Sequence, residues 1–274
     1  MSDDPLKPEK AVSAVAEIIS VAKGNPDARA AGANVAKSLA IVTETVKTVL
    51  LPLAALNYGA RRAQEYFQTK FESDMSKRTV GIPADDVVAP KASVAGPALQ
   101  GLAFSHDEEE LKDLYLGLLA TSMDGRSPGA AHPAFAEVIR QISVDEVKLL
   151  ESGLKYAGGS LAIASIRRTR TDPTGYVTIV RHVLNTRNEA GEQSEHNLLS
   201  AYVDNWVRLG LFEVSFAEHL LDDGSYDWVA ERPEFIAASG KPIPEGWRLE
   251  FQKGIMTRTE FGAAFARAVG ILSR

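Results

Sequence analysis

The residues with the clearest chemical potential stand together at positions 106–110, where a histidine is followed by one aspartate and three glutamates. Imidazole and carboxylate groups are common ligands of metal ions and common general acids and bases. Successive residues of a helix point about 100° apart, however, so only residues three or four positions apart converge. His106 with Glu109 or Glu110 satisfies that spacing, but a metal ion would also need ligands from a second segment.

The same stretch has the pattern of a helix N-terminus. Ser105 and Glu108 stand three residues apart in the order of a capping box, in which each side chain accepts a hydrogen bond from an otherwise unpaired amide. The acidic residues suit the positive end of the helix dipole. Because capping and the dipole account for every acidic residue here, we interpret them as the start of a helix that ends at Asp124-Gly125. We assign no metal site to them.

The other histidines do not define a site either. His132 stands before Pro133, where an imidazole can cap the following helix or approach Asp124. A catalytic role would need a nucleophile beside it, and the nearby Ser127 lacks the flanking glycines of a nucleophile elbow. Three further histidines are scattered and match no zinc spacing: His182, His196 and His219. We therefore predict that the protein is not an enzyme, with no catalytic, cofactor-binding or metal-ligating residues and no cofactor.

A predicted β-hairpin carries the best candidates for contact with nucleic acid or a partner: Arg167, Arg168, Arg170, Tyr176 and Arg181. Two segments rich in β-branched residues flank the turn sequence Asp-Pro-Thr-Gly at 172–175. Arginines can follow a phosphate backbone, and a tyrosine can stack on a base. Residues 195–274, however, carry 12 acidic against 8 basic residues, whereas a nucleic-acid reader concentrates positive charge. We therefore favour a protein contact and keep nucleic acid as the alternative.

The composition is that of a globular protein in water. The chain has 274 residues, of which 45% are hydrophobic and 24% charged, and a net charge of −6. It contains no cysteine, which excludes disulfides, thiol nucleophiles and thiolate metal sites. Its first ten residues are polar, unlike a secretory signal. The apolar run between Lys47 and Arg61 has 13 uncharged residues, fewer than the about 20 of a spanning helix. We expect a cytoplasmic protein.

Hydrophobic periodicity predicts an α-rich α+β protein. The N-terminal part reads as helices at 11–23 and 31–77, with a break near Leu50 because Pro52 cannot continue the hydrogen bonding. Residues 79–97 contain three prolines and two glycines and are predicted to form an extended connector. Three helices follow, at 106–124, at 133–142 and at 143–156, where Ser143 and Glu146 form a second predicted capping box.

The C-terminal part reads as strand, strand, helix, strand, long loop, strand and helix. The first helix is predicted to end at Gly210, and the last to be capped by Thr257 and Glu260. The apolar stripe of the first helix consists of Leu198, Leu199, Tyr202, Val203, Trp206 and Leu209. This order resembles a winged-helix module. We therefore predict three parts: an N-terminal region of long bundled helices with a connector (1–92), a helical block (93–158) and a winged-helix-like module (159–274).

Seven segments, taken together, resemble one known family. In order they are LPLAALNYG (51–59), VVAP (87–90), VAGPALQGL (94–102), DEEELKDLYLGLLATSMD (107–124), AHPAFAEVIRQISVDEVKLL (131–150), YVDNWVRLGLFEV (202–214) and KGIMTRTEFGAAFARA (253–268). Through these segments the chain resembles, over roughly residues 30–270, the bacterial Abi-alpha family of abortive-infection proteins. The resemblance implies a role in defence against phage and transfers no catalytic residue. The loop ASGKPIPEGW (238–247) departs from the pattern.

The resemblance and the residues together favour a cytoplasmic, non-enzymatic phage-defence protein that binds an unknown protein partner through its C-terminal module. The N-terminal helices would transmit the signal or form a homo-oligomer. Two alternatives stay open. The apolar segment 33–60 could act on a membrane, although charges at Lys37, Glu44 and Lys47 favour core packing or an oligomer interface. The winged-helix-like module could instead bind nucleic acid through the hairpin arginines.

Overall fold

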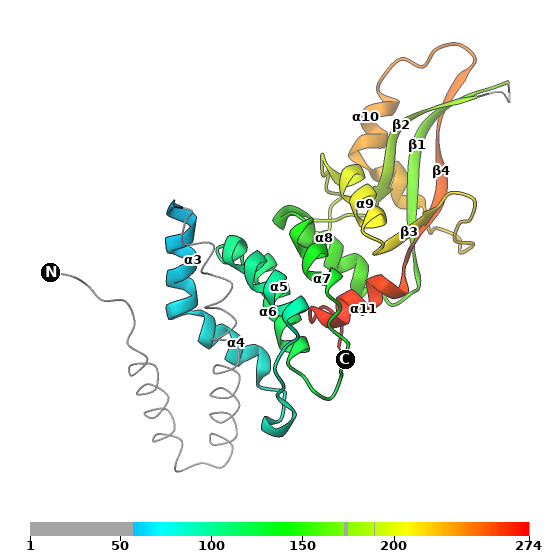
Figure 1. Ribbon diagram of the computed structural model, residues 1–274. Helices are drawn as coiled ribbons and strands as arrows, with labels where there is room; N and C mark the ends of the chain where they lie inside the picture. Colours follow the sequence, from blue (N-terminus) through cyan, green and yellow to red (C-terminus); the bar gives the residue numbers. More distant parts are fainter. Residues whose placement is uncertain (1–56, 173–174, 189, 274) are drawn as a thin grey trace. The chain divides into compact units, whose positions relative to one another are not determined.

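The computed structural model describes residues 57–172, 175–188 and 190–273 (Figure 1). They divide into two compact units. The first contains the described residues up to 144 together with 268–270, and the second contains 145–267 and 271–273. The predicted helix at 11–23, the predicted break near Leu50 and most of the apolar segment 33–60 lie outside the described residues.

The first unit is helical. Its elements are α3 (Asn57–Thr69), α4 (Phe71–Thr79), the 3-10 helix η3 (Ala84–Asp86), α5 (Ala92–Ser105), α6 (Glu109–Ser122) and α7 (Ala134–Arg140). Its core lies where α5 meets α6, with Leu102 and Leu118 fully buried. Gly101 allows this close approach, because a Cβ atom there would stand 2.2 Å from the ring of Tyr115. The predicted helical character of 57–77 is confirmed, and so is the helix predicted to precede Asp124-Gly125.

The connector is shorter than predicted. Its non-helical part ends at Lys91, and Ala92–Ser105 form α5 with Pro97 inside the helix. The prediction for 92–97 was wrong because a proline removes a single amide donor, while this helix buries Val94, Ala95 and Ala98 against its neighbours. Part of the remaining connector is packed, since Ile82 is buried. Val87 is buried and forms a β-bridge with Asp124.

The capping box at 105–108 was also a wrong prediction. Ser105 is the last residue of α5, and α6 begins at Glu109 after Glu108, which makes no side-chain capping bond. The amide of Glu108 instead donates to the carbonyl oxygen of Ser105 at 3.0 Å, which closes a tight turn between the two helices. Because burial stabilises α5 as far as Ser105, this residue ends α5 and its hydroxyl cannot cap α6.

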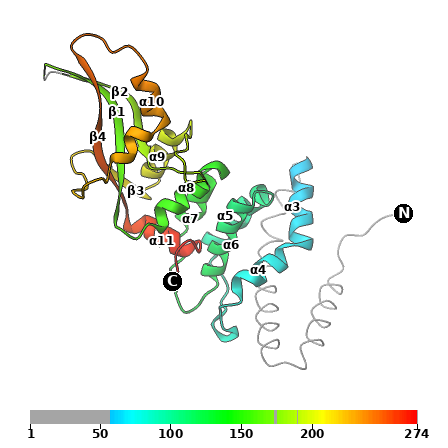
Figure 2. The same cartoon turned by 180° about the vertical axis from the view of Figure 1, so that it is seen from behind.

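The second unit combines helices with one sheet (Figures 1 and 2). Its elements are α8 (Val144–Lys155), β1 (Ser160–Arg170), β2 (Tyr176–Leu184), α9 (Leu199–Arg208), β3 (Phe212–Ser215), η4 (Asp227–Glu231), α10 (Pro233–Ser239), β4 (Trp247–Arg258) and α11 (Glu260–Ala268). The four strands are antiparallel and follow the order β2-β1-β4-β3. The long pair β1–β4 runs in register from Ser160↔Thr257 to Arg170↔Trp247. The predicted hairpin is therefore confirmed.

One sheet face carries a hydrophobic core. Ala164 and Ile166 of β1 and Val183 of β2 pack there with Trp228 and Val229 of η4. Alternation along the strands places Leu249 and Phe251 of β4 on this same face. A separate contact joins α9 to β3, where the ring of Trp206 lies 6.0 Å from that of Phe212.

Two details of the C-terminal helices differ from the prediction. Thr257 belongs to β4, and the cap of α11 is Thr259, whose Oγ1 accepts from the amide of Gly262 at 2.8 Å. The strand extends further than expected because β3 pairs with its end, Phe212 facing Arg258. In α9, Leu199, Val203 and Trp206 are buried, whereas Leu198 precedes the helix and is 57% exposed. Gly210 has a φ of 73°, as expected after a helix.

The helix-rich α+β class is confirmed by the described residues. The predicted bundle of long N-terminal helices falls largely outside them. The three-part division at 92 and 158 and the winged-helix-like character of 159–274 stay predictions.

Candidate functional site

The acidic stretch 106–110 does not converge on a point. The Nδ1 atom of His106 lies 3.1 Å from the carbonyl oxygen of Ala103, at the end of α5. Asp107 pairs with Arg62 at 3.1 Å, and Glu109 pairs with Lys112 at 2.5 Å. Within the described ranges, no three His, Asp or Glu side chains gather as ligands of a metal ion. The chemistry of this stretch is that of ion pairs, one within α6 and one from the turn before α6 to α3.

His132 caps a helix, which was one of the two roles considered for it. Its Nδ1 atom accepts a hydrogen bond from the amide of Ala134 at 3.1 Å, at the start of α7. Asp124 is buried and forms a bidentate pair with Arg126, with an Nε–Oδ1 distance of 2.8 Å and an Nη2–Oδ2 distance of 2.7 Å. The same guanidinium donates to the carbonyl oxygen of Gly81, so the pair also ties down the connector.

The five candidate residues of the hairpin do not form one basic face. Successive residues of a strand point to opposite faces, so Arg167 is separated from Arg168 and Arg170. In the register, Arg168 stands between Val177 of β2 and Leu249 of β4. Arg167 lies on the other face, with its guanidinium 5.1 Å from the centre of the Tyr176 ring.

Two of the arginines are engaged by carboxylates. Arg167 donates to Glu250 at 2.9 Å and to Gln252 at 3.0 Å. Arg170 donates to Asp172 at 2.8 Å and stacks near the ring of Trp247. Within the described residues, Arg168 and Arg181 have no carboxylate partner. The unbalanced positive charge of the hairpin therefore lies on these two side chains.

Glu250 is the carboxylate that organises the Arg167 face. The Oγ1 atom of Thr169 donates to its Oε1 at 2.6 Å, and Arg248 donates to its Oε2 at 3.0 Å. These bonds, that of Thr169 first and those of Arg167 and Arg248 after it, hold the pKa of Glu250 below its usual value. The face is thus a fixed network, in which Arg167 is committed to a structural partner.

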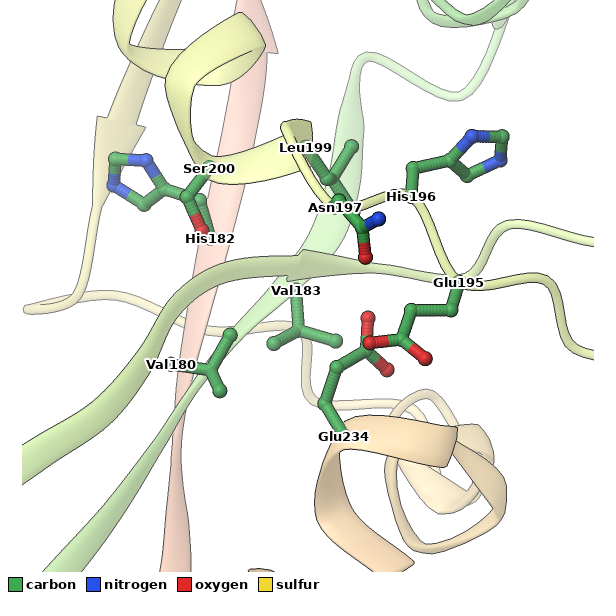
Figure 3. A pocket seen from close by; sticks show the side chains of 9 residues that line it. All are labelled: Val180, His182, Val183, Glu195, His196, Asn197, Leu199, Ser200 and Glu234. Atoms are coloured by element: carbon green, nitrogen blue, oxygen red, sulfur yellow. The ribbon is translucent and has the colours of Figure 1, made fainter. Parts of the chain in front are cut away.

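A pocket of about 180 Å³ opens between β2, the segment before α9 and the start of α10 (Figure 3). It is lined by Val180, His182, Val183, Glu195, His196, Asn197, Leu199, Ser200 and Glu234. Figure 3 shows the rings of His182 and His196 turned away from the carboxylates of Glu195 and Glu234. The titratable groups of the pocket therefore do not meet as an acid and base pair.

Glu234, one of the residues that line this pocket, pairs with a buried arginine that no sequence pattern indicated. The side chain of Arg232 is fully buried and pairs bidentately with Glu234, with an Nε–Oε2 distance of 2.9 Å and an Nη2–Oε1 distance of 2.5 Å. Its Nη1 donates to Oγ1 of Thr186 at 2.5 Å and to the carbonyl oxygen of Ser194 at 2.9 Å. One guanidinium thus joins α10 to the loop after β2.

His182 has an unusual backbone and an unusual environment. Its φ is 56°, in the left-handed region that non-glycine residues rarely adopt, at an irregularity in the β1–β2 register. The ring stacks on Phe216, and its buried Nδ1 lies 3.3 Å from Oδ1 of Asp204 without forming a hydrogen bond. Burial lowers the pKa of His182, an effect that Arg181 reinforces and that Asp204 and the backbone contact with Ser200 oppose.

This lowered pKa predicts that the second unit loses stability in mild acid. The unfolded chain binds a proton at His182 more readily than the folded protein does, so the contribution to stability is present above the unfolded pKa of about 6.5 and is lost as the pH falls through the folded value. We expect His182→Asn to reduce the difference in unfolding free energy between about pH 7.5 and about pH 5.5. Asparagine tolerates a positive φ and does not titrate.

Urea denaturation of both proteins at the two pH values checks this prediction. The matched control is His219→Asn, at an exposed histidine of the same unit, which should keep the wild-type pH dependence. An unchanged pH dependence in His182→Asn would contradict the assignment to His182.

One comparison with known proteins finds a match that covers most of the chain. A family model described as "Abortive infection alpha" matches residues 63–269. No curated protein and no solved structure matches. In the part of the chain that the structure describes, no helix is both long and apolar enough to cross a membrane. The matched region contains the hairpin, the pocket and six of the seven segments that carried the resemblance, the exception being 51–59. Because it covers more than half of the chain, the protein belongs to the abortive infection alpha family.

Proposed function

We propose that this protein acts in defence against phage, in the cytoplasm, by binding a protein partner through its second unit and without catalysing a reaction. The observation that carries the proposal is the family match over residues 63–269. In this proposal the first unit and the N-terminal segment transmit the signal or bring copies of the chain together.

The geometry of the second unit supports a binding role. Arg167 and Arg170 are held by Glu250 and Asp172, so the hairpin offers less charge to a phosphate backbone than its sequence suggests. At the same time its outer strand exposes Tyr176 and Val177, with 61% and 56% of their surfaces accessible. Exposed aromatic and branched side chains beside arginine are typical of protein interfaces.

Phage plating tests this proposal. Cells that express the full chain should yield fewer plaques than cells that carry the same gene with an early stop codon. A variant with a destabilised second unit, Trp206→Ala, should lose the protection, and the surface variant Arg187→Ala should keep it. Equal plating with and without the protein, over a panel of phages, would refute the defence role.

A further inference from the structure

The outer edge of β2 is open for hydrogen bonding over its first four residues. Within the described residues, β2 pairs with β1 on one side and with no strand on the other. The amide of Arg170 donates to the carbonyl oxygen of Gly175, and the register continues with Arg168↔Val177. In an antiparallel pair, alternate residues direct their main-chain groups to the partner strand. Gly175 and Val177 therefore face β1, and Tyr176 and Thr178 direct their N–H and C=O groups outward.

The open stretch ends where α9 begins to cover the strand. The register irregularity at 181–182 turns β2, and the hydroxyl of Ser200 at the start of α9 donates to the carbonyl oxygen of Arg181. Beyond this point Val183 is buried. Figures 1 and 2 both show the first half of β2 projecting with β1 past α10. The exposed edge is therefore the stretch 176–179.

This edge lacks the features that usually protect an edge strand. Natural proteins place lysine, proline or a bulge on such strands to prevent pairing with another chain. The stretch 176–179 reads Tyr-Val-Thr-Ile and contains neither lysine nor proline, and the register of β2 with β1 becomes irregular only at its last residue, Ile179, which lies between the partners of Arg167 and Ile166. These four residues have high β-propensity. The edge is thus suited to accept an added strand.

The charge around the edge indicates the chemistry of the added strand. Arg168 stands opposite Val177 in the register, and its buried Nε atom has no hydrogen-bond partner. Arg181 is exposed two residues beyond the open stretch. An acidic strand would place carboxylates near both. A second copy of this chain would instead bring equal positive charges together across the pair, which is destabilising.

We propose that the edge 176–179 of β2, here called the β2 edge, binds an extended, acidic segment of a partner protein as an additional strand of the sheet. The main-chain groups of Tyr176 and Thr178 hold the segment, and Arg168 and Arg181 select its charge. Strand addition gives affinity through main-chain bonds and specificity through alternate side chains. This inference rests on the proposed function, for which it supplies the binding surface and the class of partner.

Fluorescence anisotropy with the full chain tests the β2 edge. The probe is a labelled peptide of alternating glutamate and valine, compared with an alternating lysine and valine peptide and with the acidic peptide N-methylated at alternate amides. We expect only the unmethylated acidic peptide to bind, with an affinity that falls as salt is added.

The variant Thr178→Pro removes an amide that faces away from β1, so the hairpin should persist and binding should weaken about tenfold or more.

Charge variants test whether Arg168 and Arg181 select the acidic peptide, or whether any arginine of the sheet attracts it. Arg168→Gln and Arg181→Gln should each weaken binding of the acidic peptide, and the control Arg248→Gln, at an exposed arginine paired with Glu250, should not. Amide hydrogen exchange of β1 confirms that the hairpin persists in Thr178→Pro. Three outcomes would each overturn the inference. The basic peptide could bind equally well, single-stranded DNA or RNA could displace the acidic peptide, or the chain could self-associate in a way that Thr178→Pro abolishes.

Phage plating distinguishes the inference from the proposed function. If the wild-type chain protects cells and Thr178→Pro protects them equally, the β2 edge is not the functional surface, although the defence role stands. If the wild-type chain gives no protection, the defence role fails, while peptide binding still decides whether the edge accepts an acidic strand.

Discussion

Replacing Trp206 with alanine is expected to lower the free energy of unfolding of the second unit by about 4 kcal/mol. The indole is fully buried between α9 and β3, where it contacts the ring of Phe212. Its Nε1 atom donates to Oε2 of Glu146 on α8 at 2.9 Å, and Glu146 is itself 3% exposed. Alanine would therefore leave a cavity and also take a donor away from a buried carboxylate.

A double-mutant cycle separates the cavity from the hydrogen bond. Trp206→Phe retains most of the ring and removes the N–H, and Glu146→Met removes the acceptor. If the bond contributes as the geometry indicates, the double variant should be more stable than the sum of the single effects predicts, by about 0.5–3 kcal/mol in urea denaturation. Strict additivity would mean that the bond contributes nothing to stability.

Arg232→Ala is expected to lower the free energy of unfolding of the second unit by about 3–5 kcal/mol, because it leaves the largely buried carboxylate of Glu234 without its cation. The hydroxyl of Thr186 and the carbonyl oxygen of Ser194 lose the same donor. The loss of stability should appear first in the loop that Arg232 holds. Amide hydrogen exchange should rise in the loop 185–198 before it rises in β1, since the guanidinium is what joins this loop to α10.

Arg187→Ala is the matched control for this prediction. Arg187 belongs to the same loop, but its pair with Glu231 is exposed on both sides, at 43% and 61% of the side-chain surfaces. Its removal should cost less than about 1 kcal/mol. A combined Arg232→Met and Glu234→Gln variant should be more stable than Arg232→Ala, because no buried charge is left unpaired. If Arg232→Ala were as mild as the control, the buried pair would not hold the loop.

Local patterns predicted the existence and type of most described elements. The β-branched segments around the turn at 172–175 predicted β1 and β2, and helical periodicity predicted α6, α8 and α9. Of the six residues predicted to face inward from α9, Leu199, Val203 and Trp206 are buried, whereas Leu198 is exposed. These properties depend on residues close together in the chain, so periodicity and turn chemistry are sufficient to reveal them.

Boundaries and caps were less predictable, because long-range packing competes with local preference. Ser105 has the residue type of an N-cap, yet the burial of α5 makes it the end of that helix. Pro97 is tolerated inside the same helix for the same reason. Thr257 does not cap α11 because the end of β4, to which it belongs, pairs with β3. The paired residues Phe212 and Arg258 are 46 positions apart in the sequence.

The sequence by itself determined that this protein is a helix-rich α+β chain of the abortive infection alpha family and that its hairpin carries arginines. Only the tertiary structure decided which of those arginines are held by carboxylates, that Arg232 is a buried clamp, and which half of β2 is open. The physical reason is that ion pairing, burial and edge exposure depend on which distant segments meet, whereas periodicity records only the neighbours of each residue along the chain.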